Sequence, residues 1–287
     1  MSKILIRTDS SSSIGLGHVM RDLVYAKRYH SSDEVIFASM KLCGNIIKKI
    51  ANEGYRVEIL KTNKIDELNL LLKNLQINTL IIDHYGIDYE YEKEIKLKNP
   101  KLKLMVFDDT YEKHFADIII NHNLSADLKK YQNPSKVQII SPLIREEFEK
   151  EKSIKRDKIY DYFIALGGAD TLNATPKILK KLSKDSKKAI LTTTANKHLE
   201  ELTKIAKKEQ NITLHVDSKK VAKLLNQSKY AIITPSVMAH EVLFMGVPFL
   251  AIKTAKNQDD MYRYLKEHSF RVFESVESFL KDKTWEY

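Results

Sequence analysis

ILIRTDSSSSIGLGH, residues 4–18, is the stretch that decides the fold. Its apolar beginning predicts a buried strand, and the turn that follows leads straight into a helix, as in the first half of a βαβ unit. Gly15 and Gly17 let the backbone of this turn pass close to a ligand, and the serines, Ser13 among them, offer hydroxyl groups. His18 lies at the N-terminus of the expected helix and is the one group there that moves a proton near neutral pH. The stretch therefore predicts a chemical site at the first strand-to-helix turn.

Two interpretations of this turn stay open. Many α/β proteins carry glycine at the first strand-to-helix turn for tight packing alone. The pattern GxGH also lacks the lysine of a P-loop and the full GxGxxG of a dinucleotide site. In the second interpretation His18 is a catalytic base and Asp9 is placed to orient it. Spacing alone does not decide between the two.

Short β-branched runs alternate with longer amphipathic runs along the whole chain, which is typical of parallel sheets built from βαβ units. The first series of expected strands lies at 4–7, 35–38, 56–60, 80–82, 104–107 and 118–120. The second series lies at 160–166, 189–192, 212–215, 230–233 and 249–252. A highly charged stretch, residues 145–158, separates the two series and is interpreted as a linker.

We therefore expect an α/β protein with two Rossmann-like domains, residues 1–150 and 151–287, that face each other across a cleft. Ligands of such sheets bind at the carboxyl ends of the strands, so both domains are expected to contribute to one site. Residues 271–287 are interpreted as a helix that packs back on the first domain, although nothing in the segment specifies a role.

Charge and composition narrow the class of protein. The 287 residues include 48 Lys and Arg against 38 Asp and Glu, a net charge of +10, but the lysines are scattered along expected helices. Without an arginine-rich arm or a basic run interleaved with aromatic residues, this charge favours a solvated surface over nucleic-acid binding. The single cysteine, Cys43, excludes an intrachain disulfide and a multi-cysteine metal site. No apolar run approaches the roughly 20 residues of a membrane span, and no signal segment precedes the first strand, so we expect a cytoplasmic protein that binds no membrane.

Polar clusters follow two expected strands of the first half, IIDHYG at residues 81–86 and FDDT at residues 107–110. Asp108 and Asp109 are a carboxylate pair, but strand-end acids often only cap loops, and no third ligand lies at a metal-like spacing. We therefore expect no metal. His84 is either a ligand contact or a turn histidine that only completes local hydrogen bonds, and both remain open.

Polar clusters also follow strands of the second half. Gly167 and Gly168 come after the first strand of that series. After the fourth strand, Thr234 is expected to cap a helix that begins at Pro235, so that exposed amides around Ser236 form an anion site suited to a pyrophosphate. A well-capped helix without a ligand explains the same residues.

Two further features of the second half suit recognition of a sugar nucleotide. Glu241 lies one to two turns into the helix after Ser236, where a carboxylate accepts hydrogen bonds from both hydroxyls of a ribose. The next strand ends before KTAKNQ, residues 253–258, in which amide side chains donate to sugar or phosphate oxygens and Lys253 or Lys256 adds positive charge.

With these motifs in order, the chain resembles the UDP-2,4-diacetamido-2,4,6-trideoxy-β-L-altropyranose hydrolases of pseudaminic acid biosynthesis, a pathway of flagellin glycosylation. That family is related to GT-B glycosyltransferases such as MurG. The likeness covers nearly the whole chain. It is carried by RTDSSSSIGLGHVMRD (7–22), LIIDHYGI (80–87), SPLIREEF (141–148), GGAD (167–170), the segment around Asn226, and KNQ (256–258).

The resemblance implies a role for several of these residues. It implies that His18 is the catalytic base and that Tyr85 lies beside the sugar. It implies that Glu241 binds the ribose, that the backbone and hydroxyls near Ser236 bind the diphosphate, and that Asn257 and Gln258 face the substrate. Thr234-Pro235-Ser236 differs from the serine-rich turn of some members, which leaves open which hydroxyl contacts the β-phosphate.

The expected reaction is attack of water on the anomeric carbon with inversion, which releases UDP and 2,4-diacetamido-2,4,6-trideoxy-L-altrose. The substrates are the UDP-sugar and water, with no cofactor, and Arg7, Arg21 and Lys253 are candidates to stabilise the leaving group. A GT-B glycosyltransferase that uses the same donor and a nucleotide-sugar-binding protein without turnover are the alternatives. The oligomeric state stays open.

Overall fold

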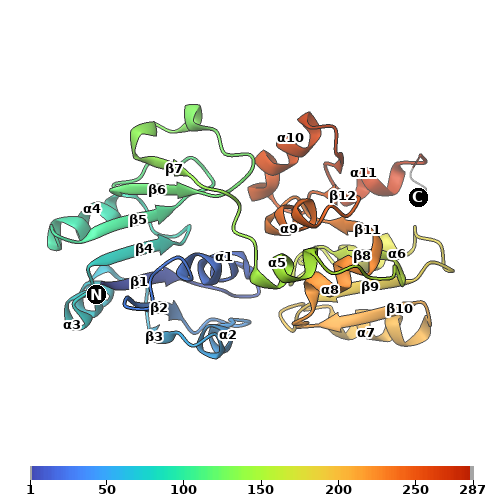
Figure 1. The fold of residues 1–287 in the computed structure, drawn as a ribbon, viewed down its shortest axis with the longest axis horizontal. Coiled ribbons are helices and arrows are strands. Elements are labelled where there is room, and N and C mark those ends of the chain that lie inside the picture. Colours follow the sequence, from blue (N-terminus) through green and yellow to red (C-terminus); the bar gives the residue numbers. More distant parts are fainter. Residues whose placement is uncertain (1, 285–287) are drawn as a thin grey trace. The chain divides into compact units, whose positions relative to one another are not determined.

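The computed structural model describes residues 2–284, and the chain divides into two compact units, Met1–Leu143 and Ile144–Tyr287 (Figure 1). Each unit is a parallel α/β sheet, as expected. In the first unit the strand order is β3-β2-β1-β4-β5-β6-β7, and in the second it is β10-β9-β8-β11-β12-β13. Numbered within its own unit, each sheet therefore contains the order 3-2-1-4-5-6, which is that of a doubly wound nucleotide-binding fold, and the first sheet adds β7 at its edge.

Over residues 2–143, the first unit holds seven strands and four α-helices. Its strands are β1 (Lys3–Thr8), β2 (Glu34–Met40), β3 (Arg56–Leu60), β4 (Thr79–Asp83), β5 (Lys103–Phe107), β6 (Ile118–Asn121) and β7 (Val137–Ile139). Its helices are α1 (Gly17–Ala26), α2 (Ile47–Asn52), α3 (Ile65–Leu75) and α4 (Tyr89–Lys98), with 3₁₀ helices η1 (Leu128–Lys130) and η2 (Pro134–Lys136).

The described part of the second unit, residues 144–284, holds six strands and seven α-helices. Its strands are β8 (Tyr160–Ala165), β9 (Lys188–Thr192), β10 (Ile212–Val216), β11 (Ser228–Ile233), β12 (Phe249–Ile252) and β13 (Arg271–Phe273). Its helices are α5 (Glu146–Lys152), α6 (Ala174–Leu179), α7 (Leu199–Lys208), α8 (Val221–Asn226), α9 (Val237–Met245), α10 (Asp259–Glu267) and α11 (Val276–Lys281), with a 3₁₀ helix η3 (Lys256–Gln258).

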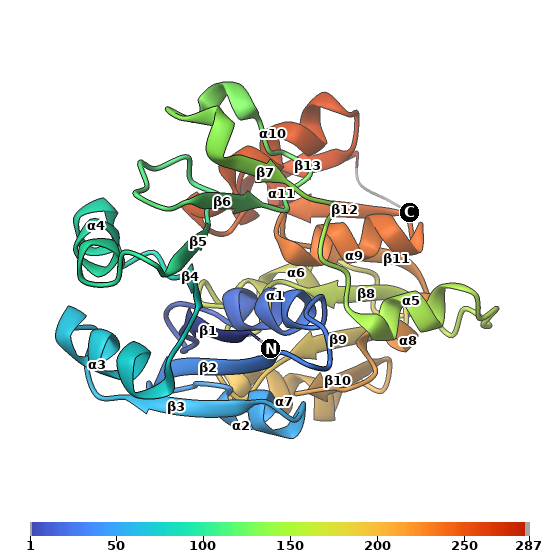
Figure 2. The ribbon, with the colours of Figure 1, turned by 60° about the vertical axis from the view of Figure 1, so that its left-hand side comes forward.

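Strand β1 shows why these sequences fold into a two-faced sheet. It is buried on both sides, and alternate side chains point to opposite faces. Leu5 joins a core cluster with residues of α3 and α4, whereas Ile4 and Ile6 join a separate cluster with residues of α1 and α2. Helices therefore cover both faces of the first sheet, which Figure 2 shows from the side.

The structure corrects the interpretation of residues 145–158 as a linker. Glu146–Lys152 form α5, which packs on α8 and α9, and Phe148 is completely buried. Most of the charged residues that suggested a linker lie on the exposed side of this short helix, whereas Phe148 anchors it and Glu151 is buried in an ion pair with Arg156. Two strands were also missed, β7 and β13, because each is a three-residue strand at a sheet edge with little apolar signal.

The C-terminal segment has more than one element. Residues 271–273 form β13, and α11 covers only Val276–Lys281 of the helix expected over 271–287. Phe279 of α11 is completely buried in the core of the second unit, and α11 packs on α6 and β13. Residues 285–287, at the end of the expected helix, lie outside the described part of the chain.

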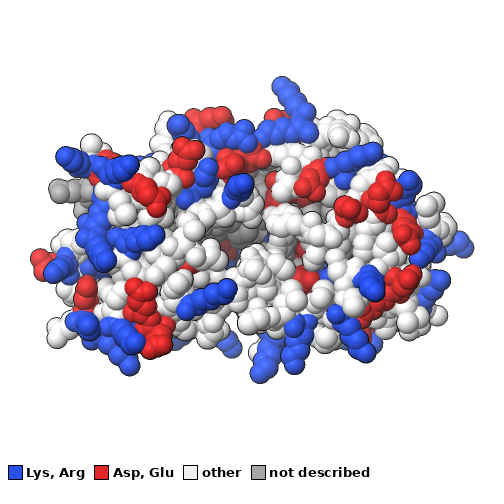
Figure 3. All heavy atoms as spheres, turned by 180° about the vertical axis from the view of Figure 1, so that it is seen from behind, with Lys and Arg blue, Asp and Glu red and all other residues white. Residues whose placement is uncertain are grey.

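The surface agrees with a solvated distribution of charge. On the face that Figure 3 shows, lysine and arginine side chains are interspersed with acidic ones. Among residues 2–284, no helix is long and apolar enough to cross a membrane.

Candidate active site

The switch point of the first sheet lies between β1 and β4, the neighbouring strands from which the chain winds in opposite directions. Thr8, at the end of β1, pairs in register with Asp83, at the end of β4. The turn after β1 leads into α1, so His18 in the first turn of this helix and Asp83 come to the same place. His18 Nδ1 lies 2.5 Å from Asp83 Oδ1, and both side chains are buried.

The hydrogen bond to Asp83 fixes the chemistry of His18. With Nδ1 donating to the carboxylate, the neutral ring keeps Nε2 as its proton acceptor, and no hydrogen bond to Nε2 forms within residues 2–284. Burial alone raises the pKa of Asp83, but the charges and hydrogen bonds of Arg21 and His18 outweigh it, so the pKa is held far below its ordinary value. Asp83 therefore stays ionised and stabilises the imidazolium that forms when Nε2 takes a proton.

Arg21, one turn further along α1, joins two acidic strand ends. Its Nε and Nη2 donate to the two oxygens of Asp83 at 2.6 and 2.5 Å, and its Nη1 donates to Asp109 at 2.8 Å. Tyr85 donates its hydroxyl to the other oxygen of Asp109 at 2.9 Å, and its ring meets the His18 ring edge to face at 4.6 Å. The Tyr85 side chain remains exposed. Arg21, in contrast, is buried and committed to its two carboxylates.

Asp9 does not orient His18, contrary to expectation. Its two oxygens accept from Arg7 Nη1 and Nη2 at 2.7 and 2.8 Å, and one of them also meets His84 Nε2 at 3.1 Å. His84 Nδ1 accepts from the amide of Gly86 at 2.9 Å, so both ring nitrogens are used. His84 is thus a turn histidine that completes local hydrogen bonds, and Arg7, completely buried against Asp9, is held away from solvent.

The sequence missed Asp83 as a functional residue. It is the first polar residue after the buried run of β4, a signal that was visible but was assigned to no role. Its importance depends on β4 being the neighbour of β1, and strand order is a property of the three-dimensional sheet.

The serine-rich turn after β1 closes on itself. The amide of Gly15 donates to the carbonyl of Ser11 at 2.9 Å, and the Ser11 and Ser13 hydroxyls lie 3.0 Å apart. Gly15 has a φ of 89°, a left-handed conformation that favours glycine, whereas Gly17 opens α1 with empty space where a side chain would point. Both glycines therefore leave room beside the backbone next to His18.

The acidic pair Asp108 and Asp109 is divided between two networks. Asp109 belongs to Arg21 and Tyr85, whereas Asp108 accepts from the amide and the hydroxyl of Thr110 at 2.8 Å. Asp108 also lies 3.8 Å from His114 Nε2. In the part of the chain that the structure describes, no group of three or more His, Cys, Asp or Glu side chains is arranged to hold a metal.

The switch point of the second sheet lies between β8 and β11. After β8, Gly167 has a φ of 87°, and the carbonyl of Gly168 accepts from the Thr193 hydroxyl at 2.8 Å. Asp170, in the same turn, accepts from two amides at the start of α6 at 2.8 and 2.9 Å. The turn is thereby held rigidly beside the carboxyl end of β8.

After β11, helix α9 begins later than expected. Thr234 does not cap it and Pro235 is not its first residue: Ser236 stands at the N-cap position and the helix begins at Val237. The physical reason is a local turn in which the amide of Ser236 donates to the carbonyl of Thr234 at 2.9 Å. The Thr234 and Ser236 hydroxyls lie 3.0 Å apart at the start of the helix. Hydroxyls and first-turn amides are thus gathered where an anion binds well.

Glu241 lies in α9 and is almost completely buried, at 1% exposure. Its two oxygens accept from Arg145 Nε and Nη2 at 2.5 and 2.8 Å. The candidate ribose ligand is therefore held by Arg145, a residue of the SPLIREEF motif.

The side chains of the last candidate segment, residues 253–258 after β12, differ in their contacts. Gln258 turns its side-chain oxygen back to accept from the amide of Thr254 at 2.8 Å, so it stabilises its own loop. Lys253 pairs with Asp259 at 2.8 Å, which uses its charge locally. Asn257 and Lys256 are exposed.

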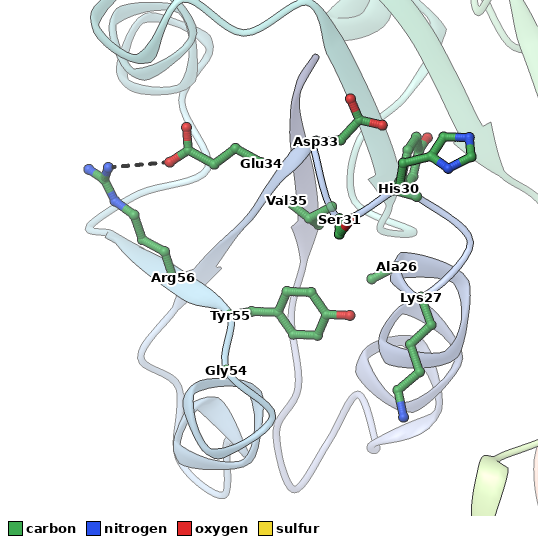
Figure 4. Close-up of a pocket in the computed structure, with 11 residues that line it drawn as sticks. Ala26, Lys27, His30, Ser31, Asp33, Glu34, Val35, Gly54, Tyr55 and Arg56 are labelled. Atoms are coloured by element: carbon green, nitrogen blue, oxygen red, sulfur yellow. Dashed lines mark ion pairs between the residues drawn. The ribbon is translucent and has the colours of Figure 1, made fainter. Parts of the chain in front are cut away.

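The first unit also has a hollow at the end of its sheet that is opposite to His18. About 400 Å³ in volume, it lies between the end of α1 and the starts of β2 and β3 (Figure 4). Glu34 and Arg56 in its wall pair with each other. The hollow is at the amino ends of the strands, whereas His18 and Asp83 are at the carboxyl ends, so it does not belong to the candidate site.

Comparisons with known proteins agree with this architecture. No protein-family model matches the chain. The chain is 40% identical over 276 residues to the UDP-2,4-diacetamido-2,4,6-trideoxy-β-L-altropyranose hydrolase of Campylobacter jejuni, a match that covers 94% of this chain and 98% of that protein.

Solved structures show the fold. The spinosyn rhamnosyltransferase SpnG matches with a TM-score of 0.68 at 12% identity, over 98% of this chain and 88% of that one. MurG of Acinetobacter baumannii matches with a TM-score of 0.60 at 12% identity, over 95% of this chain and 86% of that one. The expected α/β fold with two Rossmann-like domains, as in GT-B glycosyltransferases, is confirmed.

Proposed function

We propose that this chain, which belongs to the family of UDP-2,4-diacetamido-2,4,6-trideoxy-β-L-altropyranose hydrolases, hydrolyses that UDP-sugar to UDP and 2,4-diacetamido-2,4,6-trideoxy-L-altrose. The observation that carries the proposal is the buried pair of His18 and Asp83 at the switch point of the first sheet. It supplies a general base whose acceptor nitrogen is fixed, which is what activation of water requires. The cytoplasmic location expected from the sequence is part of the same proposal.

In the proposed reaction His18 Nε2 takes a proton from a water molecule while the water oxygen attacks the anomeric carbon. The bond between that carbon and the oxygen of the β-phosphate breaks, and its electron pair leaves with UDP. A single displacement of this kind inverts the anomeric configuration. The proton on His18 passes to solvent afterwards, so the products are the free sugar and UDP, and the Asp83 carboxylate stabilises the intermediate imidazolium.

The departing diphosphate needs charge stabilisation more than a proton, because a pyrophosphate has low proton affinity. We assign this role to the start of α9, where the Thr234 and Ser236 hydroxyls and the first amides meet. Arg7, Arg21 and Lys253, candidates from the sequence, are each paired with carboxylates, which argues for a structural role instead.

Other residues of the two switch points complete the proposed site. Ser13, Gly15 and Gly17 line the approach to His18 in the first unit, and Tyr85 contacts the sugar. In the second unit Gly167, Gly168 and Asn257 contact the nucleotide sugar, and Glu241 accepts from the ribose. Gln258 is proposed to support this loop.

The test is release of UDP from the purified UDP-sugar in the absence of any acceptor. We expect full turnover by the wild type, and for His18→Asn a fall in kcat of roughly 10²-fold to 10⁴-fold with UDP affinity retained. His30→Asn, a change at an exposed histidine outside the site, is the matched control and should leave kcat unchanged. Activity of His18→Asn within a few-fold of the wild type would remove His18 from the mechanism.

The same assay separates the alternatives. A glycosyltransferase would release UDP only when a sugar or lipid acceptor is added. A protein that only binds the nucleotide sugar would show binding by calorimetry without release of UDP.

A further inference from the structure

The guanidinium of Arg145, the residue before α5, is fixed on three sides within the second unit. Its Nε and Nη2 hold the two oxygens of Glu241, and its Nη1 donates to Glu147 at 2.8 Å. Its carbon also lies 4.8 Å from the centre of the Phe148 ring. A bidentate pair aligns the plane of the guanidinium with the plane of the carboxylate, so this arrangement also fixes the orientation of the Glu241 carboxylate.

The charge balance around Glu241 depends on Arg145. Burial raises the pKa of Glu241, the hydrogen bonds and charge of Arg145 oppose the rise, and the charge of Glu147 adds to it. These two residues are the charged groups that face Glu241 from the α5 side, and Arg145 is the one that favours its ionised form. A buried carboxylate that loses such a partner is left uncompensated and takes up a proton more readily.

A carboxylate has about four lone-pair positions, and a bidentate arginine uses two of them. The remaining two are equal in number to the two hydroxyls of a ribose. We propose that Arg145 is a positioning residue for nucleotide recognition, which holds Glu241 in the orientation that accepts both ribose hydroxyls. This inference rests on the proposed function and adds to it a residue with no previous role.

The test compares UDP with 2′-deoxy-UDP by calorimetry on the full chain. Arg145→Met should weaken UDP binding roughly 10-fold but 2′-deoxy-UDP binding much less, because only UDP uses both contacts to Glu241. Without the guanidinium, Glu241 takes up a proton at a higher pH. As the pH is lowered, the affinity of the variant for UDP should therefore start to fall at a higher pH than the affinity of the wild type does. Arg145→Lys keeps the charge and should restore part of the affinity.

Arg156→Met is the matched control. Arg156 makes the same kind of bidentate pair, with Glu151 of α5, but Glu151 is not a candidate ligand. A general loss of stability would weaken the binding of both nucleotides to both variants. Thermal unfolding of each variant reports whether it folds, and if Arg145→Met does not, Glu241→Gln and Arg145→Lys carry the same comparison.

The outcomes separate this inference from the proposed function. If Arg145→Met binds UDP as the wild type does, or loses both nucleotides equally, the role of Arg145 is overturned even though UDP release by the wild type still supports hydrolysis. If the wild type binds no UDP, both proposals are overturned.

Discussion

Asp83 uses its two carboxylate oxygens to accept three hydrogen bonds, one from His18 and two from Arg21. Asp83→Asn has the same shape but lacks the charge that stabilises an imidazolium, and its amide group no longer selects one tautomer of the ring. We expect kcat to fall about 10²-fold or more, with little change in KM, because the defect lies in the proton-transfer step. Steady-state rates of UDP release measure both constants.

Asp109→Asn is the natural companion of this variant. Asp109 contacts Arg21 and Tyr85 but makes no hydrogen bond to His18, so its loss should reduce kcat much less. A folded Asp83→Asn enzyme with kcat within threefold of the wild type would show that His18 needs no carboxylate partner.

At this scale the role of His18 as the base stays a prediction, whereas the partner that the sequence indicated for it, Asp9, is wrong. Asp9 is nearer in sequence, and local spacing therefore favoured it, yet Arg7 two residues away takes both of its oxygens. Asp83 is 65 positions from His18. Contacts of this range depend on which strands are neighbours, and no local pattern contains that information.

Helix α5, which the sequence indicated to be a linker, can be tested directly. Phe148 is completely buried between α5 and its neighbours, so Phe148→Ala leaves a cavity. We expect a loss of about 3–5 kcal/mol in the free energy of unfolding of the second unit, measured by urea denaturation.

Ile154→Ala provides the comparison, because Ile154 lies just after α5 and is 42% exposed. Its effect should be within about 0.5 kcal/mol. Equal and small effects of both changes would indicate that this segment is a flexible linker after all.

His114, in the segment between β5 and β6, leads us to expect that the free energy of unfolding depends on pH. His114 Nδ1 lies 2.7 Å from Glu92 of α4, and Asp108 lies on the other side of the ring. Burial lowers the pKa of His114, but the two carboxylates outweigh it and raise the pKa to about 9 from an ordinary value of 6.5. Since the folded pKa is the higher one, the stabilisation is fully present below about pH 6.5 and is lost as the pH rises through about 9.

The expected size of this effect is about 3 kcal/mol between those limits. Urea denaturation of the wild type and of His114→Asn at several pH values measures it. The gap between their free energies of unfolding should be widest at low pH and should close on the alkaline side. A gap that stays constant from pH 6 to pH 10 would contradict the assignment of a charged His114.

At the scale of elements, the interior strands were predictable because each is a short β-branched run bounded by polar turns. The start of α9 was not, because Thr234, Pro235 and Ser236 form a good cap in either of two registers. The hydrogen bond from the Ser236 amide to the Thr234 carbonyl decides between them, and it depends on how the chain leaves β11.

For the whole molecule, the alternation of strand and helix predicted two doubly wound sheets, and both contain the strand order 3-2-1-4-5-6, to which the first sheet adds β7. This order explains why the candidate residues of each unit lie at the carboxyl ends of its strands. In each sheet the first and fourth strands are neighbours. His18 and Asp83 lie at or just after the carboxyl ends of these two strands in the first unit, and Gly168 and Ser236 do so in the second. The substrate proposed for this chain comes from its relative in Campylobacter jejuni, since neither sheet order nor local geometry specifies it.

Attack of water at the anomeric carbon is the central step of the proposed reaction, and turnover in ¹⁸O-labelled water tests it most directly. His18 belongs to the first unit with Tyr85, the proposed sugar contact, whereas the proposed diphosphate contacts belong to the second. We predict that mass spectrometry finds the label on the anomeric oxygen of the released sugar and none in UDP, and that the activity survives a chelator. Label in the β-phosphate of UDP would contradict the account, because the bond broken would then be the one between phosphorus and oxygen.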